Sequence, residues 1–329
     1  MSAIGIRLSR RPSLRLPNST ESLLLRAATG DGRCACSAWA QWRRAGGRLD
    51  GLDSSVSRLL PMVYRTLEAN QINDPDILRL RGVYRHAWVR NQRVLDRLGD
   101  ALESLNRGGI PTMVLKGAAV SVTHHRDAGA RRLDDVGVLV PPPEAEHALA
   151  LLRADGWSPL CRSNPGRVLR RRHAIALAGP RDAQIDLHRR TLAESAGDED
   201  FWSGAVPATV GRSATLAPGP TEQLLHACGP GARSGPNGLT WISDAAVILR
   251  SAGGDIDWAR LVEGVARRRI ALTTTTSLAV LRVVLDAPIP QQVMTELGRL
   301  QDISRERLLL RLSRRAIRIT AHGGDAVDS

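Results

Sequence analysis

The stretch Thr112-Met-Val-Leu-Lys-Gly-Ala-Ala-Val120, followed after a mostly polar connection by Leu133-Asp-Asp-Val-Gly-Val-Leu-Val-Pro141, decides the fold of the central third of the chain. The first part predicts a short buried strand that ends at a Lys-Gly pair and leads into a helix. The second part predicts another strand, with acidic residues at its start. Lys116 is the only lysine of the chain; the other basic residues among the 46 Lys and Arg are arginines. At this stretch the spacing of apolar residues changes from a helical to a strand pattern, and the stretch contains the only lysine of the chain.

A second pair of strands is expected further along. Residues 173–177 (His-Ala-Ile-Ala-Leu) and 184–188 (Gln-Ile-Asp-Leu-His) are short expected strands joined by the turn-forming sequence Gly179-Pro-Arg-Asp182, which is typical of a β-hairpin. A helix at residues 144–154 lies between the acidic strand and this hairpin. Residues 110–195 therefore predict a small α/β core around a mixed sheet.

Helical periodicity dominates on both sides of this core. The clearest apolar stripe covers residues 76–107, and the Gly108-Gly109 pair ends it. The predicted fold class is therefore α+β, with a small mixed-sheet core between N- and C-terminal helical bundles. The expected parts are a tail (residues 1–18), an N-terminal helical region (19–109), the core (110–195), a C-terminal helical region (196–320) and a second tail (321–329).

The chain is strongly basic, with a formal net charge of +13 and an isoelectric point near 11.1 in 329 residues. Such a charge favours anionic partners, including nucleotides, nucleic acids and acidic proteins. Nucleic acid is the least favoured, because aromatic residues form only 3% of the chain and no stacking platform is visible. Biased codon usage alone can produce an arginine excess, and the basic runs at residues 170–172 and 305–315 are read as solvated faces.

The cysteines indicate a reducing compartment. Cys34, Cys36, Cys161 and Cys228 have spacings typical of neither a zinc site nor a disulfide framework, so we expect free thiols in the cytoplasm. The N-terminal residues lack an apolar stretch long enough for a secretory signal, and we expect no segment that spans a membrane.

The Lys116-Gly117 pair at a strand end offers a cation and backbone N–H groups to a phosphate. The chain contains neither a P-loop nor a Gly-x-Gly-x-x-Gly fingerprint, so no common phosphate-binding motif accounts for the pair. Asp135 and Asp186, on two different expected strands, are carboxylates of the kind that hold Mg²⁺ on a triphosphate. Residues i and i+2 of a strand share a face, but the position two residues after Asp135 is Gly137.

The order of these motifs resembles the uncharacterised nucleotidyltransferase family of the polymerase-β superfamily. The shared features are a Leu-Lys-Gly-Ala-Ala run, an arginine, an acidic strand ending in Leu-Val-Pro, a Gly-Trp pair, and a histidine before an Asp-Leu-His strand. These features fall at Leu115, Lys116, Gly117, Ala118, Ala119, Arg131, Asp135, Leu139, Val140, Pro141, Gly156, Trp157, His173, Asp186, Leu187 and His188. With matching helical flanks, the resemblance covers roughly residues 20–290.

The resemblance implies transfer of a nucleoside monophosphate from an NTP, assisted by Mg²⁺, to a small-molecule, peptide or protein acceptor. Pyrophosphate would be released. By the same resemblance, Lys116 and Gly117 lie beside the triphosphate and Arg131 neutralises phosphate charge. Asp135 and Asp186 are the implied metal ligands and catalytic acids, with Asp186 placed to activate the acceptor.

Gly137 departs from the family pattern, which has its second acid at this position. One hypothesis is a slow enzyme whose metal shell is completed by a substrate phosphate or water. The alternative is a catalytically inactive homologue that binds a nucleotide or a partner, and the least favoured reading is a nucleic-acid-binding protein that uses its arginine-rich face. His173 and His188 are candidate supporting residues that we expect mainly to pack, while His226 and Asp244 are expected to fasten the C-terminal helices to the core.

Overall fold

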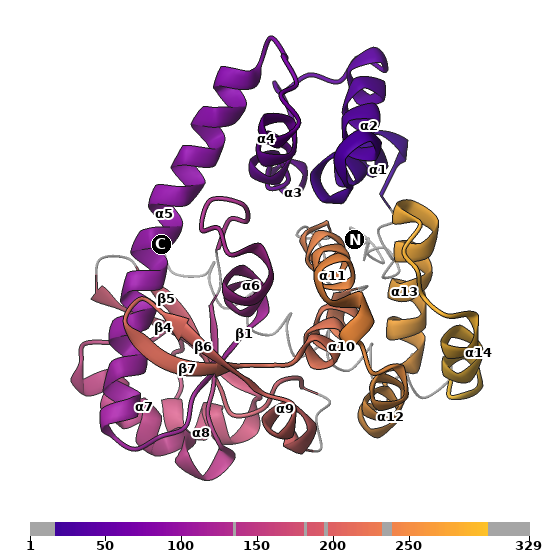
Figure 1. Ribbon diagram of the computed structural model, residues 1–329. Helices are drawn as coiled ribbons and strands as arrows, with labels where there is room; N and C mark the ends of the chain where they lie inside the picture. The colour runs from indigo at the N-terminus through magenta and orange to yellow at the C-terminus, as the bar shows by residue number, and fades with distance from the viewer. Residues whose placement is uncertain (1–16, 134–135, 181–182, 194–196, 232–238, 302–329) are drawn as a thin grey trace, which may run out of the picture.

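The computed structural model describes residues 17–133, 136–180, 183–193, 197–231 and 239–301. A seven-stranded mixed sheet carries helices on both faces, and further helices extend from it at both ends of the described chain (Figure 1). This arrangement confirms the predicted α+β class with helical flanks.

The sheet has the strand order β3-β4-β5-β2-β1-β7-β6. Its strands are β1 (Met113–Leu115), β2 (Gly137–Leu139), β3 (Ser158–Pro159), β4 (Ala174–Ala178), β5 (Gln184–His188), β6 (Val206–Val210) and β7 (Ser213–Ala217). β1 is antiparallel to β2 and parallel to β7, whereas β2 is parallel to β5. The predicted hairpin is present as the antiparallel pair β4–β5. The two strands of the fold-deciding stretch therefore lie side by side in the middle of the sheet.

The hairpin β6–β7 was not predicted, and it lies in the region expected to be helical. The chain turns at Gly211, whose φ is +59°, and β7 then pairs with β1 through Leu216 and Met113. The two strands are short and rich in Ala, Ser and Thr, so their local strand signal is weak. Their pairing with a strand a hundred residues earlier stabilises them, which no local pattern reveals.

One face of the sheet is covered by α5 (Ile77–Arg107), α7 (Ala145–Ala154) and α8 (Pro165–Arg171) (Figure 1). The long helix α5 confirms the predicted stripe at residues 76–107. Alternate strand side chains enter this layer and pack against the helices. Members of this cluster include Leu98, Leu102, Val114, Val138, Leu149 and Leu187.

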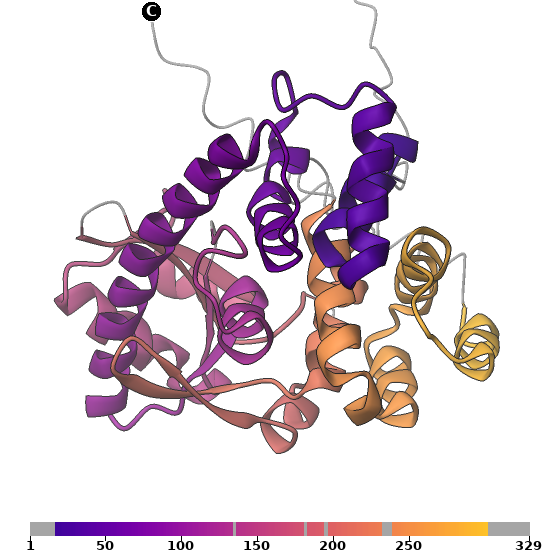
Figure 2. The ribbon, with the colours of Figure 1, turned by 45° about the horizontal axis from the view of Figure 1, so that its top comes forward.

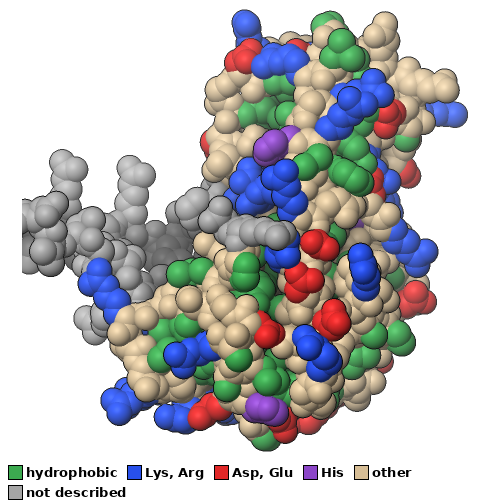
Figure 3. All heavy atoms as spheres, turned by 90° about the vertical axis from the view of Figure 1, so that its left-hand side faces the viewer, with side chains coloured by type: hydrophobic (Ala, Val, Ile, Leu, Met, Phe, Trp, Pro, Cys, Tyr) green, Lys and Arg blue, Asp and Glu red, His purple; other side chains and the backbone are tan. Residues whose placement is uncertain are grey.

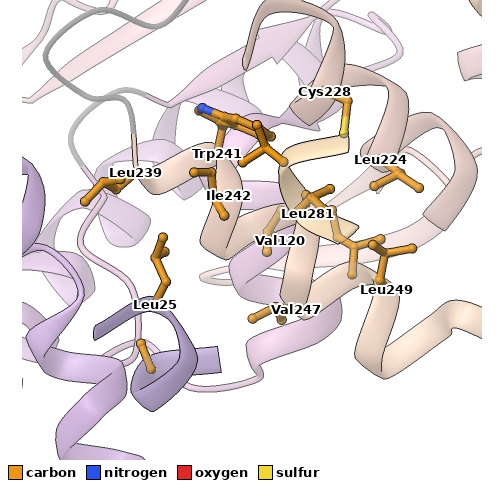
Figure 4. Close-up of a cluster of buried hydrophobic side chains, with 14 of the residues drawn as sticks. Leu25, Val120, Leu224, Cys228, Leu239, Trp241, Ile242, Val247, Leu249 and Leu281 are labelled. Carbon is orange, nitrogen blue, oxygen red and sulfur yellow. The ribbon is translucent and has the colours of Figure 1, made fainter. Parts of the chain in front are cut away.

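The other face packs against helices α6 (Lys116–Val120), α10 (Pro220–Gly231), α11 (Thr240–Ala252) and α13 (Ala271–Leu285). Side chains from these helices converge on one buried cluster, which also takes in Leu25 from the N-terminal region (Figure 4). The strand residues Met113, Leu115 and Leu139 belong to the same cluster. The sheet face that holds Leu115 is therefore directed toward the C-terminal helices.

The N-terminal helices are α1 (Ser19–Thr29), α2 (Gly32–Arg44), α3 (Ser54–Ser57) and α4 (Leu60–Ala69). Figures 1 and 2 show α1 and α4 beside α11, and buried side chains of all three helices share one cluster. The remaining short elements are η1 (Ser121–His125, a π-helical turn), η2 (Pro142–Glu144), α9 (Glu199–Ser203), η5 (Gly253–Asp255), α12 (Trp258–Arg268) and α14 (Gln291–Arg299).

Within the C-terminal region expected to be helical, α14 ends at Arg299, and residues 302–329 lie outside the described part of the chain. Among the described helices, none combines the length and the apolar character needed to cross a membrane.

Candidate active site

Lys116 stands where β1 ends and α6 begins. Its backbone φ is +54°, in the left-handed region that lysine rarely occupies. Strained backbone of this kind persists only where the surrounding structure enforces it, and it concentrates at functional positions. The turn directs the lysine side chain sideways across the sheet, toward β5.

The Lys116 ammonium forms an ion pair with Asp186 on β5, with 3.0 Å between Nζ and Oδ2. The two side chains are 31% and 27% exposed, so both remain open to a ligand. Between them lies Gly137 on β2, which faces Leu115 on one side and Asp186 on the other. Gly137 has no side chain, and the ion pair of Lys116 with Asp186 spans this strand. The structure thus brings together two residues that the sequence assigned to phosphate and metal binding.

Asp135, the other predicted metal ligand and catalytic acid, lies outside the described residues. The described chain resumes at Val136, whose carbonyl oxygen accepts a hydrogen bond of 2.8 Å from the backbone N–H of Asp186. The pairing of Asp135 with Asp186 in one metal site therefore stays a prediction.

His188 is the nearest buried neighbour of this pair. Its Nδ1 lies 3.2 Å from the carbonyl oxygen of Arg190, and its Nε2 lies 4.0 Å from Oδ2 of Asp186. Burial, together with the Lys116 charge, lowers the pKa of His188 well below its ordinary value, so the imidazole is neutral. Since a carbonyl can only accept, Nδ1 carries the proton and Nε2 is left as an acceptor, with no partner among the described residues. A Cβ built on Gly137 would lie 3.2 Å from this Nε2.

Two further histidines surround His188. The ring of His173 lies 5.6 Å from that of His188, centroid to centroid, at an interplanar angle of 56°. His226 on α10 is buried, and burial together with the Lys116 ammonium lowers its pKa to about 3. Of the three rings, His188 lies nearest to Asp186 by a measured distance, and the two buried rings, His188 and His226, are held neutral.

Arg131 lies beside Gly117 but is held by Asp244 on α11. Its Nε and Nη2 donate to the two carboxylate oxygens of Asp244 at 2.6 and 2.9 Å, and both residues are buried. A Cβ on Gly117 would lie 1.9 Å from Nη1 of Arg131, so the glycine makes room for the guanidinium. The charge that the sequence assigned to phosphate is therefore largely balanced by Asp244, which gives the expected fastening role of Asp244 a physical basis.

Replacing Asp244 with asparagine is expected to reduce the free energy of unfolding by about 3–5 kcal/mol, because Arg131 would keep a buried charge without its carboxylate. The double variant Arg131→Met/Asp244→Leu should recover most of this loss, since it removes both charges. Denaturant unfolding followed by circular dichroism measures both effects. The control is Asp255→Asn, an exposed acid in η5. Equal stability of Asp244→Asn and of the double variant would contradict the proposed charge balance between Arg131 and Asp244.

Asn91 and Arg90 on α5 hold the loop that leads into β2. Asn91 is fully buried; its Nδ2 donates to the carbonyl oxygens of Ala128 and Arg131 at 2.5 and 2.6 Å, and its Oδ1 accepts from the N–H of Leu133 at 2.9 Å. Arg90 donates to the carbonyl oxygen of Leu133 at 2.6 Å. Asn91 falls within the apolar stripe of residues 76–107 and had no predicted role. A side-chain amide at a buried position needs hydrogen-bond partners, so its place in the apolar stripe could have identified Asn91 as a structural residue.

The described residues offer a single carboxylate, Asp186, to a metal ion at this site. No group of three or more His, Cys, Asp or Glu side chains in the described chain is arranged to hold a metal. Mg²⁺ takes oxygen ligands and is often bound by one or two carboxylates together with substrate phosphates and water. The residues present therefore fit a magnesium ion that arrives with a triphosphate better than one held by the protein alone.

A family model described as "Uncharacterised nucleotidyltransferase" matches residues 54–286 of the chain. The match includes the whole sheet and runs from α3 to α13, so it contains each of the described site residues. No curated protein matches the chain.

Proposed function

Because the chain belongs to the uncharacterised nucleotidyltransferase family, we propose that it transfers a nucleoside monophosphate from an NTP to an acceptor at the Lys116–Asp186 pair. The observation that carries this proposal is the 3.0 Å contact between the ammonium of Lys116, at the end of β1, and the carboxylate of Asp186 on β5, across the intervening strand β2. Both side chains are partly exposed and lie in the stretch that the family shares.

In this reaction an acceptor hydroxyl attacks the α-phosphorus of the NTP. A bond forms between the acceptor oxygen and the α-phosphorus, and the bond from that phosphorus to the pyrophosphate oxygen breaks. Asp186 takes the hydroxyl proton as general base. A triphosphate at the strand ends competes with Asp186 for the Lys116 ammonium, so substrate binding itself would release the carboxylate for this role.

Asp186 is also the described residue that would hold magnesium. When bound, Mg²⁺ supplies charge neutralisation on the triphosphate and on the departing pyrophosphate. Asp186 would share this task with Asp135, as the family resemblance implies. Lys116 adds a second positive charge on the side of β1.

Incubation with labelled ATP tests the proposal. Transfer of label from the α position, and not from the γ position, to an acceptor in a cell extract is the expected result. The same assay with the other three NTPs determines base preference. Absence of transfer from any of the four NTPs would count against the enzymatic function.

Replacing Lys116 with alanine is expected to weaken NTP binding by about 10- to 100-fold, because a charge-assisted contact worth about 1.5–3 kcal/mol is lost. Isothermal titration calorimetry with Mg·ATP measures the change, and Arg299→Ala, which removes an exposed charge on α14, is the matched control. Since Lys116 is the only lysine, ¹³C-methylation of amines gives one side-chain NMR signal, which should shift when ATP is added. Unchanged affinity in Lys116→Ala would contradict the assigned phosphate contact.

The alternative is a catalytically inactive homologue that binds a nucleotide, and Gly137 is the observation that favours it. Without the second acid, nucleotide binding would depend on Lys116 more than on magnesium. Binding that survives EDTA and is lost in Lys116→Ala would therefore support the inactive homologue. Binding that EDTA weakens would support the enzyme.

Nucleic-acid binding through an arginine face is the least favoured function. On the face shown in Figure 3, Arg and Lys side chains alternate with acidic and apolar ones, so that face shows no continuous basic track. Retention on heparin with a steep salt dependence would favour this function instead.

A further inference from the structure

A cavity with both polar and apolar lining lies away from the Lys116–Asp186 pair, where α1, α2, α4 and α11 meet the end of η1. We call it the α2 pocket; its lining includes Gly30, Gly32, Arg65, Thr66, His125 and Arg250. Its volume is about 240 Å³. This is below the range of about 300–1,000 Å³ typical of pockets for drug-sized ligands, so the pocket suits a small group rather than a whole nucleotide.

Two arginines from different helices line the α2 pocket. Arg250 on α11 donates to the carbonyl oxygens of Thr29 and Gly30, and the charge of Asp31 acts on its guanidinium. Arg65 on α4 pairs with Asp127 at 2.8 Å and is 43% exposed, so its guanidinium keeps donors for a ligand. The only acid in the lining is Asp31, which leaves an excess of positive charge.

The N-terminus of the 13-residue helix α2 opens into the same pocket. Asp31, at the N-cap position, makes no side-chain hydrogen bond to the first turn. The first backbone N–H groups of a helix have no partner within the helix, and they carry its partial positive charge. Gly30 and Gly32, on either side of the N-cap, carry no side chains, and Oδ1 of Asn70 would lie 3.6 Å from a Cβ built on Gly32.

His125 independently indicates a ligand site. Its Nε2 is buried and has no hydrogen-bond partner among the described residues. Burial, followed by the charges of Arg131, Arg65 and Arg250, lowers its pKa to about 3, so the ring is neutral and lies near three guanidinium groups. His125 is the last residue of the π-helical turn η1, and turns of this type are frequent at functional sites.

We propose that the α2 pocket binds a phosphate group, held between Arg65, Arg250 and the N-terminus of α2. A tetrahedral oxyanion presents oxygens in several directions, which suits donors that converge from α2, α4 and α11, whereas a carboxylate is matched by one arginine. The site is separate from the triphosphate contact at Lys116 and does not depend on catalysis. The segment α6–η1 connects the two sites, because it begins at Lys116 and ends at His125.

The test adds a fixed negative charge to the pocket. Thr66→Glu places a carboxylate in the lining without removing an arginine contact, and Thr295→Glu adds the same charge to an exposed position on α14 as the control. In the wild-type chain and in Thr295→Glu, inorganic phosphate should raise the thermal unfolding midpoint. In Thr66→Glu the dissociation constant for phosphate should rise at least tenfold, because the new carboxylate occupies the anion site.

A chain whose unfolding midpoint does not respond to phosphate, or equal phosphate affinity in the two Thr→Glu variants, would overturn the proposal. Lys116→Ala should bind phosphate as the wild type does; loss of phosphate binding there would assign the anion to the triphosphate site instead. Comparison with a phosphate monoester identifies the source of the group. Tighter binding of the monoester indicates a phosphorylated ligand, and equal or tighter binding of inorganic phosphate indicates the free ion.

Discussion

Replacing Asp186 with asparagine is expected to reduce nucleotidyl transfer at least about 100-fold, the usual contribution of a positioned general base. The asparagine keeps the size of the side chain but can neither take the acceptor proton nor offer a negative charge to magnesium. Its effect on NTP affinity should be much smaller than that of Lys116→Ala. Lys116 loses an anionic partner at 3.0 Å in this variant, which favours its contact with phosphates.

Single-turnover transfer from α-labelled ATP measures this effect, with NTP affinity measured in parallel. Asp96→Asn, which removes an exposed acid on α5, is the matched control and should keep full activity. A loss of binding as large as the loss of transfer would show that Asp186 acts in nucleotide binding and not as a base. Unchanged transfer would remove Asp186 from the chemistry altogether.

Much of this architecture could be predicted from local patterns. The helix α5 and the hairpin β4–β5 have strong periodicity and turn signals, and both are present close to their predicted bounds. The hairpin β6–β7 was not predicted, because alanine, serine and proline weaken the local strand signal of both segments, although they pair with each other at five positions and β7 is joined to β1 at one. Local sequence describes an element well when its propensity and turn signals are strong, and poorly when small residues and proline weaken them.

The same distinction applies to the site. Lys116 and Asp186 were singled out from motif order, and the structure brings them into contact. The partner of Arg131 could not be predicted from spacing, because Asp244 lies 113 residues further on, across a helix interface. Likewise, the α2 pocket combines residues of five segments, none of which carries a recognisable motif.

Replacing Gly137 with aspartate is expected to raise nucleotidyl transfer and magnesium affinity, by about tenfold or more if the substrate otherwise supplies the missing ligands. Gly137 pairs directly with Asp186, so the new carboxylate would lie on the same sheet face. The space is tight: a Cβ at this position would lie 3.1 Å from Cβ of Leu115 and 3.2 Å from Nε2 of His188. Both neighbours must move by a few tenths of an ångström, and some loss of stability should accompany the gain.

The matched control is Gly137→Asn, which has the same size and crowding but no charge. It should lose the same stability and gain no transfer. The new carboxylate should also raise the pKa of His188, because a negative charge beside Nε2 favours the protonated ring, and ¹H–¹⁵N NMR of the imidazole can follow this change. If Gly137→Asp folds as Gly137→Asn does but transfers no faster than the wild type, the site lacks more than one acid. The inactive homologue would then be the better description, with Lys116 retained for binding alone.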